Sequence, residues 1–236
     1  MANKNHPSSV VHHPSLFKAI VAIVQKDFVA EYHSRELVPT MLAFSLIIII
    51  IFNFALELDI KTRQSVTAGV LWTTFAFAGT LGLNRSMAIE KDHGSMDGLL
   101  LAPVERTAIY FGKTISNLAF MLLVEAIVLP IYSLLYNVNL FQAYLLGVIL
   151  LGSIGYTAVG TLLSAMSVQT RTRDVLLPIL LLPIALPVLL ASVKASGGLL
   201  NGAEFSEILA PLNILIAYDV IFIAVAYMVF DFVVEE

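Results

Sequence analysis

Two acidic residues interrupt long apolar stretches of the sequence. Glu125 is the only charged residue between positions 114 and 170, and Asp219 lies within the apolar stretch 208–230. A carboxylate at the middle of a bilayer costs roughly 2.5–3.5 kcal/mol on insertion scales. Each acid therefore indicates either a polar cargo path or proton relay, or a carboxyl that is protonated or held by a local hydrogen bond, to Tyr218 or to a hydroxyl of a neighbouring helix. Of the two acids, Asp219 is the stronger functional candidate.

Other catalytic and metal-binding patterns are weak. The sequence Phe-Gly-Lys-Thr at 111–114 is similar to the end of a phosphate-binding loop, but Thr107 stands where that loop needs glycine, and no strand is predicted before it. The absence of cysteine excludes a disulfide, a thiolate metal site and thiol redox chemistry. The five histidines all lie outside the apolar stretches, at His6, His12, His13, His33 and His93. We therefore predict no catalytic, cofactor or metal site on this chain.

The longest polar interruption after the N-terminus is the segment 90–103, which reads Glu-Lys-Asp-His-Gly-Ser-Met-Asp-Gly-Leu-Leu-Leu-Ala-Pro. Gly94 is suited to end a helix, Ser95 to cap a short new one, and Pro103 to begin a third. Consecutive leucines in a charged loop need an apolar cover, which is either the protein's own helices and lipid or another subunit. We favour another subunit. The predicted contacts are Glu90, Asp92, His93, Gly94, Asp97, Gly98, Leu99, Leu100 and Pro103.

Composition indicates the class of protein that must position these residues. The 236 residues are 58% hydrophobic and 13% charged, with a mean hydropathy of +0.89. A soluble domain has roughly 45–50% apolar and about 25% charged residues. The chain is therefore predicted to be an all-α polytopic membrane protein. Its net charge of -4, with basic residues scattered among acids, argues against a nucleic-acid partner.

Apolar runs of about 20 residues are long enough to cross a bilayer. Asn137 and Asn139 supply a turn that divides the run 114–170 into two helices. Pro183 and Pro187 predict a hinge in the fifth span, and the glycine-rich stretch 196–202 predicts an external loop or short re-entrant piece. The six predicted spans are 37–56, 66–84, 108–136, 140–167, 175–193 and 208–230.

Two further features belong to the spans. Trp72, near the outer end of the second span, is predicted to be a membrane-interface residue. Small side chains recur at three- and four-residue spacing along the fourth span and predict close helix packing. They are Gly152, Ser153, Thr157, Gly160, Thr161 and Ser164.

The N-terminal region divides into a flexible leader, 1–14, and a partly amphipathic helix at 16–32 that lies on the inner membrane face. Residues 15–236 then form one transmembrane domain with a cytoplasmic coupling segment at 86–107. The side chains expected toward water are Lys18, Gln25 and Lys26, and those expected toward lipid are Phe17, Ile20, Val24 and Phe28.

Basic residues predict the orientation. Ten of the 13 Lys and Arg residues lie on the side of both termini and of segment 90–103, and three lie on the other side. By the positive-inside rule, both termini are cytoplasmic. We therefore expect a multi-pass protein of a bacterial inner membrane.

The string EKDHGSMDGLLLAPVERTAIYFGK, which starts at Glu90, and the string LLLPIALPVLL at 180–190 resemble the cytochrome c maturation protein B family. This family comprises membrane subunits of type-2 ABC exporters. The resemblance implies a soluble CcmA-like ATPase that holds ATP, CcmC-, CcmD- and CcmE-like membrane partners, and a second copy of the chain. It also implies that the chain is no enzyme itself, and that it couples ATP hydrolysis to haem delivery or to release of a haem-loaded chaperone.

Alternative functions remain open from the sequence alone. Only methionine and tyrosine, such as Met121, Met166 and Tyr218, remain as iron ligands within the bilayer. The residues therefore favour a transducer over direct haem carriage, although an exporter of haem or another amphipathic cargo is the next interpretation. A proton-coupled secondary transporter would use Glu125 and Asp219, but the inverted repeats typical of that class are not visible. A passive scaffold would leave the charged segment unexplained.

Overall fold

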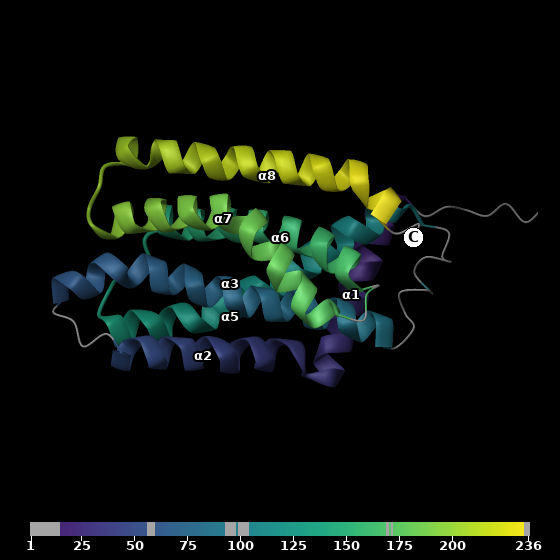
Figure 1. Ribbon diagram of the computed structural model, residues 1–236, viewed down its shortest axis with the longest axis horizontal. Helices are drawn as coiled ribbons and strands as arrows, with labels where there is room; N and C mark the ends of the chain where they lie inside the picture. The colour runs from purple at the N-terminus through teal and green to yellow at the C-terminus, as the bar shows by residue number, and fades with distance from the viewer. Residues whose placement is uncertain are drawn as a thin grey trace, which may run out of the picture.

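Seven long helices make up the part of the protein that the structure describes. The computed structural model describes residues 15–55, 60–92, 98, 104–168, 170 and 172–233. The helices are α1 (Leu16–Ser34), α2 (Leu37–Ala55), α3 (Ile60–Asp92), α5 (Arg106–Tyr136), α6 (Ala143–Val168), α7 (Arg173–Leu200) and α8 (Phe205–Val233). No strand occurs among these residues, and the prediction of an all-α fold is confirmed. Figure 1 shows the long helices running side by side as an elongated bundle.

Six of the helices are long and apolar enough to cross a membrane, which confirms the predicted number of spans. Their bounds are Leu37–Ala55, Val66–Asp92, Arg106–Tyr136, Ala143–Val168, Asp174–Leu200 and Phe205–Phe230. The predicted turn after the third span is also present, because Asn137 adopts a left-handed conformation (φ 52°) that ends α5. Asparagine tolerates this region better than most residues.

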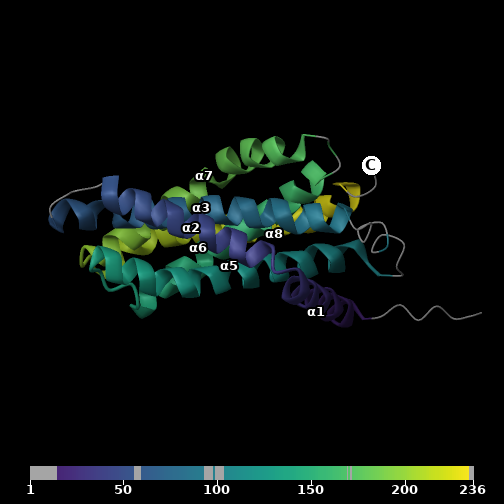
Figure 2. The same ribbon diagram turned by 90° about the horizontal axis from the view of Figure 1, so that it is seen from below.

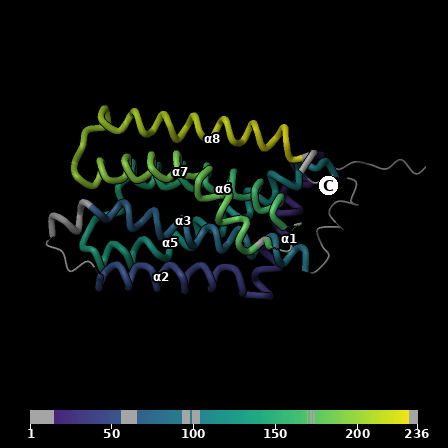
Figure 3. The backbone as a smooth tube through the Cα atoms, in the orientation of Figure 1, coloured from purple at the N-terminus to yellow at the C-terminus, as the bar shows by residue number. Residues whose placement is uncertain are grey.

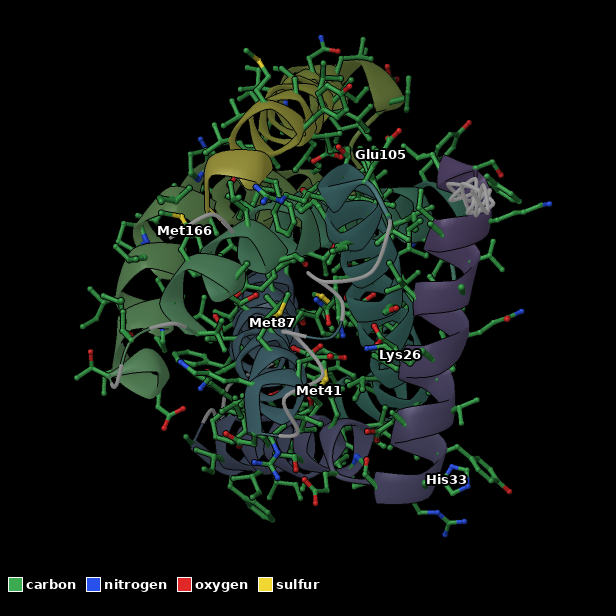
Figure 4. All side chains as sticks on the ribbon, turned by 90° about the vertical axis from the view of Figure 1, so that its right-hand side faces the viewer. Lys26, His33, Met41, Met87, Glu105 and Met166 are labelled. Carbon is green, nitrogen blue, oxygen red and sulfur yellow. The ribbon has the colours of Figure 1, made fainter. Side chains whose placement is uncertain are left out.

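The first helix runs across the end of the bundle instead of along it (Figures 1 and 4). Figure 2 shows it outside the long helices, next to α5. Ala19, Ile23 and Asp27, spaced four residues apart, form its buried face. Phe17 and Phe28 are exposed, as expected for lipid-facing residues. The prediction that Lys26 points to water is correct only in part, because its side chain is 37% exposed while its amine pairs with Glu90 of α3.

The fourth span, α6, lies at the centre of the bundle and packs against α3, α5, α7 and α8. All six of its predicted small packing residues are buried, which confirms the packing face. Their small size brings large neighbours close to the α6 backbone. Trp72 is one of these neighbours: it is only 1% exposed, and its indole N–H donates a 3.0 Å hydrogen bond to the Ser196 hydroxyl. The membrane-interface prediction for Trp72 is therefore wrong.

Adding one methyl group at Gly152 is expected to destabilise the bundle. A Cβ there would lie 2.2 Å from the Trp72 ring and 2.5 Å from the Ser192 hydroxyl. Overpacking of this kind costs about 1–3 kcal/mol. Thermal unfolding of Gly152→Ala in detergent should show this loss. Gly147→Ala is the matched control on the same helix, because a Cβ at Gly147 meets no atom within 4 Å. Equal unfolding midpoints for the two variants would contradict the packing role of Gly152.

The fifth span, α7, contains Pro178, Pro183 and Pro187 and is nevertheless a continuous helix. It changes direction partway along its length (Figures 1 and 3). Each proline removes a helical hydrogen bond and crowds the carbonyl four residues earlier, which favours such a bend.

The expectation of a loop or re-entrant piece at 196–202 is wrong for most of that stretch, because α7 continues to Leu200. Gly198 is a position of close approach within this helix: a Cβ there would lie 3.1 Å from the Ile208 side chain of α8. Glycine at this position thus allows two helices to meet.

Candidate functional site

Segment 90–103 is bracketed by two long helices at one end of the bundle. α3 ends and α5 begins there, at the same end as α1 and the last turn of α8 (Figure 1). Asp92 and Gly98 are exposed, as a partner contact requires, whereas Glu90 is only 7% exposed. The other predicted contacts lie outside the described residues: His93, Gly94, Asp97, Leu99, Leu100 and Pro103.

Glu90 belongs to a cluster of four charges, of which three are buried and Lys26 is partly exposed. We call it the charge cluster, and its members are Lys26 and Asp27 of α1, Glu90 of α3 and Lys113 of α5. The Lys113 amine donates hydrogen bonds to Asp27 Oδ1 at 2.8 Å and to Glu90 Oε1 at 2.5 Å. Lys26 also donates to Glu90 and lies 3.3 Å from Asp27 Oδ1. Figure 4 shows Lys26 pointing from α1 toward the bundle, whereas His33 points away from it. The cluster joins three helices.

Local sequence explains how α1 and α5 come close enough for this pairing. Gly112 precedes Lys113, and a Cβ at Gly112 would lie 2.8 Å from the Cβ of Ile23 on α1. The missing side chain lets the two helices approach. The Lys113 side chain is 2% exposed and belongs to the buried face of α5. The Gly-Lys pair of the sequence similar to a phosphate-binding loop therefore serves helix packing and ion pairing.

The cluster balances two cations with two anions. Burial alone would lower the pKa of Lys26, but the hydrogen bond to Glu90 and the charges of Asp27 and Glu90 outweigh it and raise that pKa above its ordinary value. Lys26 thus stays charged at neutral pH. Asp27 Oδ2 has no hydrogen-bond partner among the described residues. Asp27 lines a cavity of about 30 Å³, which has room for one water molecule.

Two further contacts tie α1 to the spans. The Glu31 carboxylate accepts hydrogen bonds from the backbone N–H groups of Leu37 (3.1 Å) and Val38 (2.9 Å), the first residues of α2. Carboxylates stabilise helix N-termini by satisfying these N–H groups. Arg85 of α3 pairs with Glu36, between α1 and α2. These contacts and the charge cluster connect α1 to α2, α3 and α5.

Asp27 and Lys113 are two site residues that the sequence patterns did not predict. A signal was present, because each charge lies on a predominantly apolar helix face. Such charges are rarely buried without a partner. What the sequence lacks is any indication of which partner each would take.

The intramembrane acid Glu125 is 2% exposed and lies against α6. Its Oε1 accepts a 2.7 Å hydrogen bond from the Ser153 hydroxyl. Its Oε2 is without a hydrogen-bond partner in the described part of the chain. This contact fits the simpler of the two interpretations of Glu125, a carboxyl held by a local hydrogen bond.

The second intramembrane acid, Asp219 of α8, is 6% exposed and has neither oxygen hydrogen-bonded within the described ranges. Its Oδ1 lies against Gly155 of α6, where a Cβ would come within 2.3 Å. The expected bond from Tyr218 is absent from this structure, because that hydroxyl donates at 3.0 Å to the Ile184 carbonyl, between two prolines of α7. Asp219 therefore differs from Glu125 in having no hydrogen bond to its carboxyl from any described residue.

The two acids do not form a pair. Glu125 meets α6 at Ser153 and Asp219 meets it at Gly155, and residues two apart point to different sides of a helix. The described residues also contain no group of three or more His, Cys, Asp or Glu that would hold a metal ion.

The candidate haem ligands are scattered. Met121 is buried beside Gly79, and Met166 is exposed (Figure 4). The hydroxyl of Tyr218 is already hydrogen-bonded to α7. The three side chains therefore do not converge on one site.

Comparison with known proteins identifies the family. The sequence model of the CcmB protein family matches residues 18–235. Heme exporter protein B of Rhodobacter capsulatus is 30% identical over 176 residues, which covers 74% of this chain and 79% of that protein. Proteins of the same name from Paracoccus denitrificans and Bradyrhizobium diazoefficiens are 27% and 26% identical, over 65% and 75% of this chain and 71% and 80% of their own length. This chain belongs to the CcmB protein family.

Proposed function

We propose that this chain is the membrane subunit of an ABC-type haem exporter that serves cytochrome c maturation. In this proposal, a separate ATPase hydrolyses ATP, and the chain couples that hydrolysis to haem delivery or to release of a haem-loaded chaperone. Family membership and relatives named heme exporter protein B support the transport class. The six membrane-spanning helices fit a membrane subunit.

The observation that supports the coupling role is that α3 ends at Asp92 and α5 begins at Arg106 at the same end of the bundle, so that the chain segment 93–105 connects these two helices. These helices have 33 and 31 residues and continue from that end deep into the bundle. Because helices move as rigid elements, a push on the connection between them would reach the membrane interior. The exposed Asp92 and Gly98 leave this end accessible to a soluble partner.

ATP belongs to the partner in this proposal. Lys113 is the lysine that would have contacted phosphate in the motif at 111–114, and it is committed to Asp27 and Glu90 inside the protein. The remaining proposed partners are CcmC-, CcmD- and CcmE-like proteins and a second copy of this chain.

Purification with and without a CcmA-like ATPase tests the proposal. We expect no ATP hydrolysis by the chain alone, hydrolysis by the complex, and loss of cytochrome c maturation when the phosphate-binding lysine of the ATPase is replaced. A chain that supports full maturation with this inactive ATPase would refute ATP coupling. It would favour the second candidate, a proton-coupled transporter, which is supported by the buried Asp219 carboxyl, because that carboxyl has no hydrogen-bond partner among the described residues.

The proposed location is a bacterial inner membrane with both termini in the cytoplasm. The natural chain has no cysteine, so single cysteines report topology without background labelling on this protein. An impermeant thiol reagent added to the periplasm should label cysteine at Asn139 or Asn201, at the end opposite α1. It should not label cysteine at His33 or Gly98 until the inner membrane is opened. The reverse pattern would invert the proposed orientation.

A further inference from the structure

We infer that α1 transmits movement within the coupling machinery, and that Lys113 is the positioning residue that holds α1 to the two helices flanking segment 93–105. This inference rests on the proposed coupling function and assigns a role to a helix outside the six spans. The carrying observation is the charge cluster of Lys26, Asp27, Glu90 and Lys113.

Lys113 is the hub of the cluster. Its amine contacts one carboxylate from α1 and one from α3, while its own backbone belongs to α5. Glu90 lies in the last turn of α3, just before segment 93–105, and Lys113 lies in the second turn of α5, just after it. Both sides of the segment are therefore attached to the same helix, α1.

Apolar contacts make α1 and the first half of α5 one unit. Ile23 packs on Gly112, and the rings of Phe28 and Phe120 have centroids 4.9 Å apart. The far end of α1 then binds the start of α2 through Glu31. Movement at segment 93–105 would thus pass through α3 and α5 to α1, and from α1 to α2.

The chemistry of the cluster also favours a positioning role. A buried ion pair gains little net stability, because desolvation of the charges offsets their attraction, whereas its geometry is specific. Apolar side chains in place of these charged ones would also hold the helices together, but with less preference for one relative orientation. Here one amine must meet two carboxylates from different helices, which defines a single arrangement of α1, α3 and α5.

The test uses the complete complex with its ATPase in lipid nanodiscs. In Lys113→Gln, we expect ATPase association to stay within about twofold of the natural chain, while the stimulation of hydrolysis by the membrane subunit falls about tenfold, within the usual range of allosteric coupling. Lys18→Gln, at an exposed lysine of α1 that lies outside the charge cluster, is the matched control and should behave as the natural chain. Normal coupling in Lys113→Gln would overturn the inference.

A second variant tests the inference if Lys113→Gln misfolds, and the natural chain tests the proposed function separately. If Lys113→Gln does not fold, the charge-balanced variant Glu90→Gln/Lys113→Gln takes its place, because it leaves the Lys26–Asp27 pair neutral overall. The same loss of coupling is expected, and normal coupling would count against the inference. If the natural chain itself gives no stimulation of its ATPase, the proposed function fails, independently of any result for Lys113.

Discussion

Replacing Asp219 with leucine is expected to abolish cytochrome c maturation while leaving membrane insertion intact or improved. The carboxyl is buried against Gly155 with no hydrogen-bond partner among the described residues, so the fold gains no compensating contact from it. A charged aspartate at a helix centre costs roughly 2.5–3.5 kcal/mol on insertion scales, and leucine removes that cost. Insertion is measured by membrane fractionation, and maturation by haem staining of c-type cytochromes.

Asp219→Asn distinguishes a role for the titratable proton from a role for hydrogen bonding. Asparagine keeps the shape and the hydrogen-bonding capacity but has no titratable proton. If the acid serves as a relay or binds a partner's cation, both variants should insert and both should fail in maturation. Activity in the asparagine variant alone would show that a hydrogen bond suffices. Full activity of Asp219→Leu would refute a functional role and leave the carboxyl as a tolerated polar group.

Replacing Gly94 with valine is expected to weaken ATPase association by about 5–30-fold. The sequence predicts that Gly94 ends a helix in the left-handed conformation, where a side chain costs roughly 1–2 kcal/mol and a branched one is strongly disfavoured. A displaced helix end would carry the following leucines away from their partner. Pull-down of the ATPase from detergent extracts, together with cytochrome c maturation, measures the effect.

Gly147→Val is the matched control for this prediction, because it makes the same substitution on α6, outside segment 90–103. Gly147 is exposed and helical, and a Cβ there meets no atom within 4 Å. The control variant should therefore bind the ATPase as the natural chain does. If Gly94→Val binds and matures cytochromes normally, segment 90–103 is not the docking element, and another surface must provide it.

The spans and the packing face of α6 were predictable from the sequence alone. Six runs of apolar residues match six helices because burial in lipid depends on local composition over about 20 residues. Asn137 ends α5 as expected, since the left-handed preference of asparagine is a property of the residue. The small residues of α6 face its neighbours because three- and four-residue spacing places them on one side of any helix.

Only the tertiary structure decided which groups meet. Glu90 was predicted to face a partner and instead lies in a cluster with Lys26 and Lys113, which are 64 and 23 positions away in the chain. Trp72 was placed at the membrane interface but bonds to Ser196, 124 positions away. Residue type determines that a buried charge or indole needs a partner. The choice of partner depends on how the helices pack, and that information is not contained in any local stretch of sequence.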